Sequence, residues 1–107
     1  METKETQRIC GMIGFARRAG KTVIGTDLVC RAMPTGSIRL VVIAGDASQA
    51  TKKKLTVKSE FYGIPSVEAN IDTARLGNIL GKGGAVATVA ITDDRFAEEI
   101  KKAAVSE

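Results

Sequence analysis

The sequence is organised around the stretch RRAGKTVIGTDLVCRAM, which spans residues 17–33. A basic segment leads into a short apolar run at residues 22–24, and Gly25 separates this run from a helical pattern. A glycine before a helix lets the backbone approach a ligand closely and leaves the first N–H groups of the helix free. These donors and the positive end of the helix dipole favour an anionic partner such as a phosphate. The junction therefore favours contact with RNA over a catalytic site.

Two polar side chains accompany this junction. Asp27 and Arg31 are separated by one helical turn, so a helix places them on the same face. The alternative explanation is an ordinary helix start in which the hydroxyl of Thr26 caps the first turn. The local chemistry leaves both explanations open.

Helical and strand patterns alternate along the chain. Ile9, Ile13 and Ala16 recur at helical spacing, whereas residues 40–44 form a continuous apolar run typical of a strand buried on both faces. Strict alternation predicts helices on both faces of a sheet of about four strands. The expected helices span residues 2–18, 26–33, 51–62, 72–81 and 93 onward, and the expected strands span residues 22–24, 40–44, 66–68 and 86–91.

The pattern also predicts how some residues pack. Gly11 and Gly14 each weaken the first helix by about 1 kcal/mol, so they are expected at close-packing positions. In the third helix, Leu55, Ser59 and Tyr62 are expected on the inward face with Thr51. The chain has one Tyr, three Phe and no Trp, so an aliphatic core is predicted. The same scarcity argues against aromatic platforms that stack on bases.

The composition limits the classes of function. Lys and Arg number 16 against 12 Asp and Glu, which supports a polyanionic partner. The sequence has no His, so the commonest general base and the commonest metal ligand are missing. Only a Lys or Asp base would remain for an enzyme, and no catalytic residue, cofactor or metal site is expected.

The expected location is the cytoplasm. Cys10 and Cys30 do not form a disulfide framework, and they are expected to be reduced, buried thiols. The charged start of the chain predicts no signal peptide, and the apolar runs are too short to span a membrane.

Two further segments are candidates for phosphate contact. Lys52, Lys53 and Lys54 would contact phosphates if they flank Gly25, and this is expected because the second and third helices should begin at ends of neighbouring strands. A solvated helix face is the alternative. The loop at residues 81–84 has the sequence GKGG but leads into a strand, so it is not a Walker nucleotide site. It remains a flexible loop with backbone that a ligand can reach.

Several pieces of the sequence match one known family when they are taken together. They are ARRAGK at residues 16–21, GTDLVCRA at 25–32, VIAGDA at 42–47, YGIP at 62–65, Leu76-Gly77 with Gly81, and VAI at 89–91. The chain resembles the kink-turn RNA-binding ribosomal proteins of the archaeal seven-Ae and eukaryotic thirty-e types. It most resembles the bacterial stand-alone branch of this superfamily.

This resemblance implies a three-layer α/β/α sandwich with a mixed sheet. It also implies RNA binding at one end, through the start of the second helix and the loop before the last strand. The family reads sheared G·A pairs with a Gly-x-Asn-Glu-x-x-Lys stretch, in which Gly25 keeps the glycine and Arg31 takes the Lys position. Asp27 replaces the Asn and Leu28 replaces the Glu. Asp27 accepts but does not donate, and Leu28 forms no hydrogen bond.

The sequence thus predicts a non-enzymatic, monomeric RNA-binding protein made of one domain over residues 1–107. Its expected partner is structured RNA, either ribosomal or kink-turn-like. The alternative is a protein-interaction module of the same fold that has lost specific RNA recognition. The expected RNA-binding residues are Lys21, Gly25, Thr26, Asp27, Arg31, Lys52, Lys53, Lys82, Gly84 and Ala85.

Overall fold

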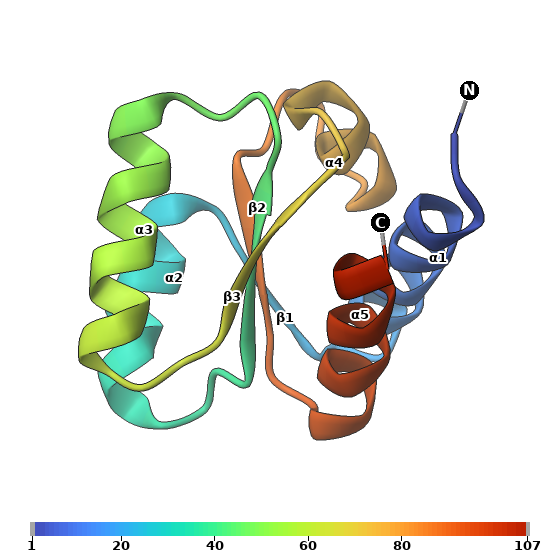
Figure 1. Cartoon of the computed structure of the whole chain (residues 1–107). Coiled ribbons are helices and arrows are strands. Elements are labelled where there is room, and N and C mark those ends of the chain that lie inside the picture. The colour runs from blue at the N-terminus through green and yellow to red at the C-terminus, as the bar shows by residue number, and fades with distance from the viewer. Residues whose placement is uncertain (1, 107) are drawn as a thin grey trace.

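Helices and strands alternate along the chain as the sequence predicts (Figure 1). The computed structural model describes residues 2–106, so both ends of the domain expected over residues 1–107 lie outside the described part. The helices are α1 (Lys4–Arg18), α2 (Thr26–Ala32), α3 (Gln49–Phe61), α4 (Thr73–Ile79) and α5 (Asp94–Ser106), with a 3-10 turn at Met33–Thr35. The strands are β1 (Thr22–Ile24), β2 (Leu40–Ala44), β3 (Ser66–Ala69) and β4 (Thr88–Ile91).

The four strands form one mixed sheet in the order β1-β4-β2-β3. Strand β4 pairs antiparallel with β1 on one side and with β2 on the other, and β2 pairs parallel with β3. The expected mixed sheet of about four strands is confirmed. The expectation that the second and third helices follow neighbouring strands is wrong, because β4 lies between β1 and β2.

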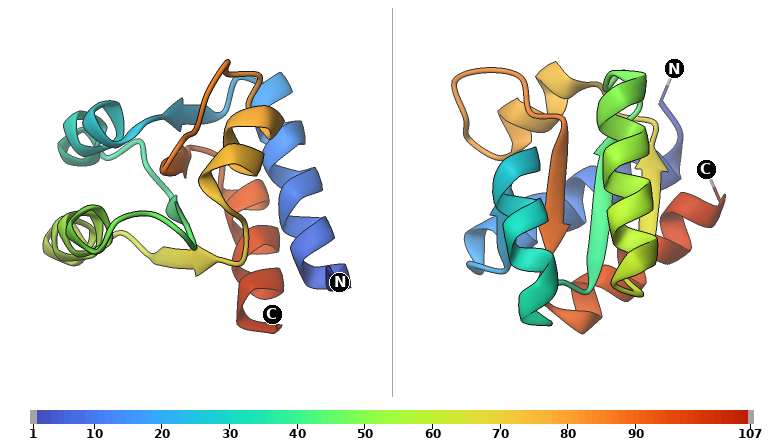
Figure 2. Two further views of the ribbon diagram at one scale, coloured as in Figure 1. Left: turned by 90° about the horizontal axis from the view of Figure 1, so that it is seen from above. Right: turned by 90° about the vertical axis from the view of Figure 1, so that its left-hand side faces the viewer.

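Helices cover both faces of the sheet, as Figure 2 shows. In β2, Leu40 and Val42 pack in a cluster with residues of α1, α4 and α5. The alternate residues Val41 and Ile43 pack in a second cluster with residues of α2 and α3. Because successive side chains of a strand point to opposite faces, one apolar strand supports both layers. The predicted three-layer α/β/α sandwich is confirmed.

The core is aliphatic, as expected from the composition. The largest fully buried side chains are Ile, Leu, Met and Val, with no aromatic residue among them. Phe15, Phe61 and Tyr62 are exposed instead. Tyr62 was expected on the inward face of the third helix, and that expectation is wrong because Tyr62 forms the C-cap of α3, where the backbone leaves the helix. Leu55 and Ser59 are buried as predicted.

Three other expectations need correction. Helix α1 begins at Lys4 rather than Glu2, because the side chain of Thr3 caps it by accepting from the Thr6 N–H. Gly11 is exposed, and a Cβ atom there would meet nothing within 4 Å, so it is not a close-packing site. At Gly14 a Cβ would make only ordinary van der Waals contacts. Strand β4 starts at Thr88 and not at residue 86.

No helix of residues 2–106 is long and apolar enough to cross a membrane. Neither cysteine in this range forms a disulfide, and Cys30 is buried whereas Cys10 is half-buried.

Candidate nucleic-acid interface

Three connecting segments meet at one end of the sheet, at the top of Figure 1. Strands β1 and β2 both run antiparallel to β4, so their C-terminal ends lie beside the N-terminal end of β4. The Gly25 N–H donates to the Thr88 carbonyl at 3.0 Å, and the Ala44 N–H donates to the Ala87 carbonyl at 2.9 Å. These bonds join the β1–α2 junction, the β2–α3 turn and the loop before β4. We call this surface the loop end.

The start of α2 is open. Gly25 is its N-cap, with φ 98°, and no side chain of the described residues caps the helix there. The alternative in which Thr26 supplies the capping oxygen is therefore wrong. The first intrahelical bond runs from the Val29 N–H to the Gly25 carbonyl at 3.0 Å. The N–H groups of the preceding residues of the first turn are thus left at the loop end, as expected for an uncapped helix start.

The loop at residues 81–87 is held against α4 by a very close approach. A Cβ atom added to Gly77 would lie 1.9 Å from the carbonyl oxygen of Gly84, which is far inside any real contact. The Val86 N–H donates to the Thr73 carbonyl at 3.0 Å and fixes the second half of the loop. A groove separates the outer face of α4 from the loop tip. Its walls are Ala74, Asn78, Lys82, Gly83, Gly84 and Ala85.

Asp46 ties the β2–α3 turn to α4. Its carboxylate accepts from the Thr73 N–H at 2.7 Å and from the Thr73 hydroxyl at 3.3 Å. Asp72 caps the same helix by accepting from the Arg75 N–H at 2.7 Å. Two carboxylates thus stabilise the start of α4 through its free N–H groups and dipole. Local sequence predicts the cap by Asp72, but Asp46 lies 27 residues away from its partner.

Arg75 also connects α4 to the beginning of the chain. Its guanidinium forms a two-pronged pair with the carboxylate of Glu2, and the second contact is 2.7 Å long. The hydrogen bond from Arg75 lowers the pKa of Glu2, and the hydrogen bond to Glu2 raises the pKa of Arg75. This ion pair supports the element that carries the loop at residues 81–87.

The predicted residues lie at different parts of this surface. Gly25, Thr26 and Asp27 are at the start of α2, and Lys82, Gly84 and Ala85 are exposed on the loop. Arg31 is exposed one turn beyond Asp27, on the same helix. Lys21 lies at the other end of β1, where its carbonyl accepts from the Thr92 N–H, about 13 Å along the strand from Gly25. The structure therefore gathers most of these residues but leaves Lys21 apart.

The lysines of α3 differ in their surroundings. The ammonium of Lys52 donates to the Gly45 carbonyl at 2.7 Å and pairs with the carboxylate of Glu68. A phosphate would have to share Lys52 with these partners. Lys53 is exposed and has no ion pair with any residue of 2–106 that the structure describes. Helices α2 and α3 pack side by side although their strands are not neighbours.

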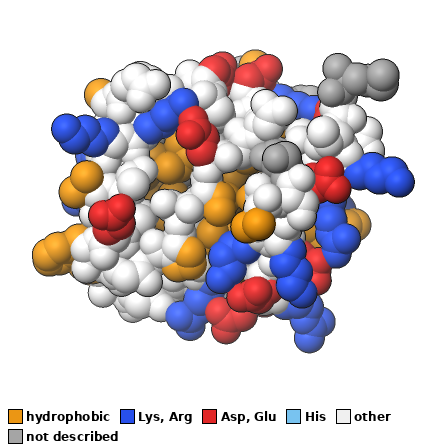
Figure 3. All heavy atoms as spheres, in the orientation of Figure 1, with side chains coloured by type: hydrophobic (Ala, Val, Ile, Leu, Met, Phe, Trp, Pro, Cys, Tyr) orange, Lys and Arg blue, Asp and Glu red, His pale blue; other side chains and the backbone are white. Residues whose placement is uncertain are grey.

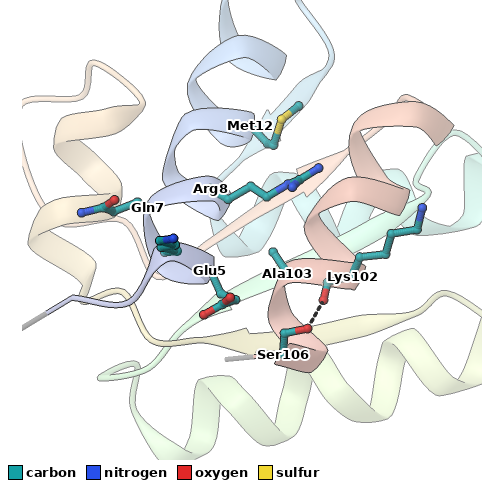
Figure 4. Close-up of a pocket in the computed structure, with 8 residues that line it drawn as sticks. Glu5, Gln7, Arg8, Met12, Lys102, Ala103 and Ser106 are labelled. Carbon is teal, nitrogen blue, oxygen red and sulfur yellow. Dashed lines mark hydrogen bonds between the residues drawn. The ribbon is translucent and has the colours of Figure 1, made fainter.

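The other face of the sheet carries a different surface. A hollow runs between α1 and α5, where Arg8 points toward α5 (Figure 4). Arg8 forms an ion pair with Glu99 of that helix. On the α5 side of the hollow, the Ser106 hydroxyl donates to the Lys102 carbonyl at 3.2 Å within the helix. Basic and acidic side chains mix over α5 in Figure 3, so this region is not a one-sign patch. Within residues 2–106 no group of three His, Cys, Asp or Glu side chains is placed to hold a metal ion.

Comparison with known proteins identifies the family. The model of the ribosomal protein L7Ae/L30e/S12e/Gadd45 family matches residues 7–101. The chain belongs to this family. Its relatives include the RNA-binding protein YlxQ of Bacillus subtilis, 38% identical over 83% of this chain and 87% of the relative. The large ribosomal subunit protein eL30 of Sulfurisphaera tokodaii is 30% identical over 81% of this chain and 85% of the relative.

Solved structures confirm the L7Ae/L30e fold. A Bacillus halodurans protein of unknown function superposes with a TM-score of 0.84 and 28% identity, covering 94% of this chain and 98% of that one. The 15.5 kD RNA-binding protein of Giardia lamblia superposes with a TM-score of 0.79, covering 99% of this chain and 89% of that one. Its identity is only 16%, so the Giardia protein supports the fold alone. The family match and the relatives named above confirm the resemblance inferred from the sequence motifs.

Proposed function

We propose that this L7Ae/L30e-family protein binds structured RNA through its loop end. The observation that carries the proposal is the family match over residues 7–101, together with relatives that are named as RNA-binding and ribosomal proteins. The open start of α2 and the exposed glycine loop support it, because both offer backbone donors to an incoming polyanion.

Each part of the loop end has a role in this proposal. The first N–H groups of α2 donate to phosphate oxygens, and Thr26 and Asp27 contact base edges. Arg31 and Lys82 form charge-assisted contacts with phosphates. Gly84 and Ala85 have little or no side chain, so the RNA backbone can approach the loop closely. The groove between α4 and the loop adds a concave surface next to these groups.

The test is a filter-binding titration with ribosomal RNA fragments at several salt concentrations. The logarithm of affinity should fall with the logarithm of salt, with a slope of about 0.7 to 0.9 for each phosphate contacted. Arg31→Ala should weaken binding by about 10- to 150-fold, since it removes a charge-assisted contact.

Arg95→Ala is the matched control. Arg95 is also exposed, but it lies in the first turn of α5, at the opposite end of the sheet from the loop end. It should leave binding unchanged. No binding at low salt, or equal losses in both variants, would contradict the proposal.

A protein-interaction module is the second candidate. Leu28 favours it, because 54% of this side chain is exposed at the loop end, where an apolar residue cannot read a base by hydrogen bonds. Under this alternative Leu28→Ala would abolish capture of a protein partner, and RNA affinity would be weak and independent of Arg31.

We further propose that the protein acts as a cytoplasmic monomer without catalytic activity or cofactor. The ribosomal names of its relatives support this assignment. Light scattering of the purified protein checks the monomer, and a dimer at micromolar concentration would refute it.

A further inference from the structure

An exposed aromatic pair ends helix α3. Phe61 is 81% exposed and Tyr62 is 40% exposed. Their ring centroids are 4.9 Å apart and the rings are nearly perpendicular, at 87°. Val57, one turn earlier, is also exposed. Two of the four aromatic residues of the chain are therefore exposed side by side at the end of α3.

Three lysines precede this pair on the same side of the helix. Lys53, Lys54 and Lys58 are exposed, and with Val57 and Phe61 they fall within an arc of about 140° around α3. Leu55 and Ser59 occupy the opposite, buried side. None of these three lysines pairs with an acidic side chain within residues 2–106. We call this surface the outer face of α3.

The outer face of α3 is continuous with the loop end. Helix α3 starts at the loop end, directly after the β2–α3 turn, and runs away from it. Its 13 residues extend about 20 Å, which is roughly the length of six stacked nucleotides. The unpaired lysines therefore lead from the loop end to the aromatic pair.

We propose that the outer face of α3 binds an unpaired RNA segment that continues from the structured RNA at the loop end. The lysines contact its phosphates, and a base stacks on Phe61. This combination of cationic groups along a track with an aromatic ring is the chemistry that binds single strands without sequence preference. An acidic protein would match the lysines but would give no reason for a ring rather than an aliphatic side chain. The inference rests on the proposed function, because it extends the same RNA site.

The test uses three RNAs. The bare hairpin carries tandem sheared G·A pairs, and the two extended forms add about eight unpaired uridines to its 5′ end or to its 3′ end. The wild type should bind one extended form at least about fivefold more tightly than the bare hairpin. Phe61→Ala and Phe61→Leu should both lose this gain, since Leu keeps an apolar surface but cannot stack. Lys54→Ala with Lys58→Ala should reduce the salt slope of the extended RNA only.

Val105→Ala is the control, because Val105 is 86% exposed on α5 and belongs to neither surface. It should keep the gain, and circular dichroism should show that all variants are folded. If the bare hairpin and both extended forms fail to bind, the proposed function and this inference both fail. If the bare hairpin binds but no extension adds affinity, only the inference is overturned. A gain kept by Phe61→Leu and lost by Phe61→Ala would also overturn it, since that pattern indicates apolar docking and not stacking.

Discussion

At the scale of single residues, the start of α2 determines what the loop end can read. Asp27 and Leu28 are both exposed there. To recognise a sheared G·A pair, one side chain must both donate and accept hydrogen bonds, and a second side chain must accept from guanine N–H groups. Asp27 lacks the donor, and Leu28 lacks the acceptor. An unmatched polar edge of the RNA costs about 1 to 3 kcal/mol.

The substitution pair Asp27→Asn with Leu28→Glu should therefore restore discrimination. The wild type should bind a kink-turn and a version with its G·A pairs changed to Watson–Crick pairs with similar affinity. The double variant should prefer the intact kink-turn by about tenfold or more. Gel-shift titrations of both proteins against both RNAs at fixed salt measure this. A strong preference already present in the wild type would show that Thr26 and the backbone at Gly25 do the reading.

A second residue-scale prediction concerns stability. Ser59 is fully buried, and its hydroxyl has no hydrogen-bond partner among the described residues. Leaving such a group unsatisfied costs about 1 to 3 kcal/mol, so Ser59→Ala should raise the free energy of unfolding by at least about 1 kcal/mol. Thr56→Ala, at an exposed position of the same helix, controls for helix propensity. Urea unfolding measures both, and a Ser59→Ala gain no larger than that of Thr56→Ala would contradict the prediction.

Sequence reasoning was uneven at this scale. It placed Gly25 correctly because a glycine between a strand and a helix has a local conformational reason. It left the capping role of Thr26 open, since the residue type does not determine the backbone geometry that decides whether a hydroxyl caps a helix. It also missed that Asp46 stabilises a helix 27 residues away, because only the folded chain brings the two together.

At the scale of elements, α4 and the loop before β4 form one unit. The carbonyl of Gly84 occupies the space that a side chain at position 77 would need. Gly77→Ala should therefore push the loop away from α4, because backbone cannot yield as a flexible side chain does. RNA affinity should fall by about tenfold or more, since a displaced loop loses its contacts. Hydrogen exchange at residues 82–86 should become faster while the amides of β2 stay protected.

Gly11→Ala is the matched control for that variant. It also replaces a helical glycine, but open space surrounds the position. It should raise the free energy of unfolding by about 0.5 to 1 kcal/mol and leave RNA binding unchanged. Equal RNA affinities in the two variants would show that RNA binding does not depend on the packing of the loop against α4.

The order of helices and strands along the chain was predictable from the sequence, whereas the order of the strands within the sheet was not. Periodicity and glycines located all five helices and four strands among residues 2–106, with ends shifted by a few residues. The insertion of β4 between β1 and β2 depends on long-range pairing that no local pattern encodes. The expectation of neighbouring strands failed for this reason, although the helices that follow them do pack together.

At the scale of the whole molecule, one ion pair joins the beginning of the chain to α4. The hydrogen bond from Arg75 lowers the pKa of Glu2 below its usual value of 4.5. A carboxyl with a lowered pKa in the folded state stabilises the fold above the usual value, and this contribution is lost as the pH falls through the lowered pKa. Glu2→Gln should therefore destabilise the protein slightly at pH 7 and make unfolding less dependent on pH below 4.5. Thermal unfolding from pH 7 to pH 3 tests this, and parallel curves for the two proteins would contradict it.

The central position of β4 determines when, during synthesis of the chain, the proposed RNA-binding surface can form. Synthesis delivers the chain from its N-terminus, yet β1 pairs only with β4, and the backbone bonds of Gly25 and Ala44 at the loop end are made to residues 87 and 88. Until those residues leave the ribosome, β1 stays without a partner strand and the loop end does not exist. A nascent chain of this protein therefore cannot capture RNA early, because the residues of β4 must be released before its binding surface closes.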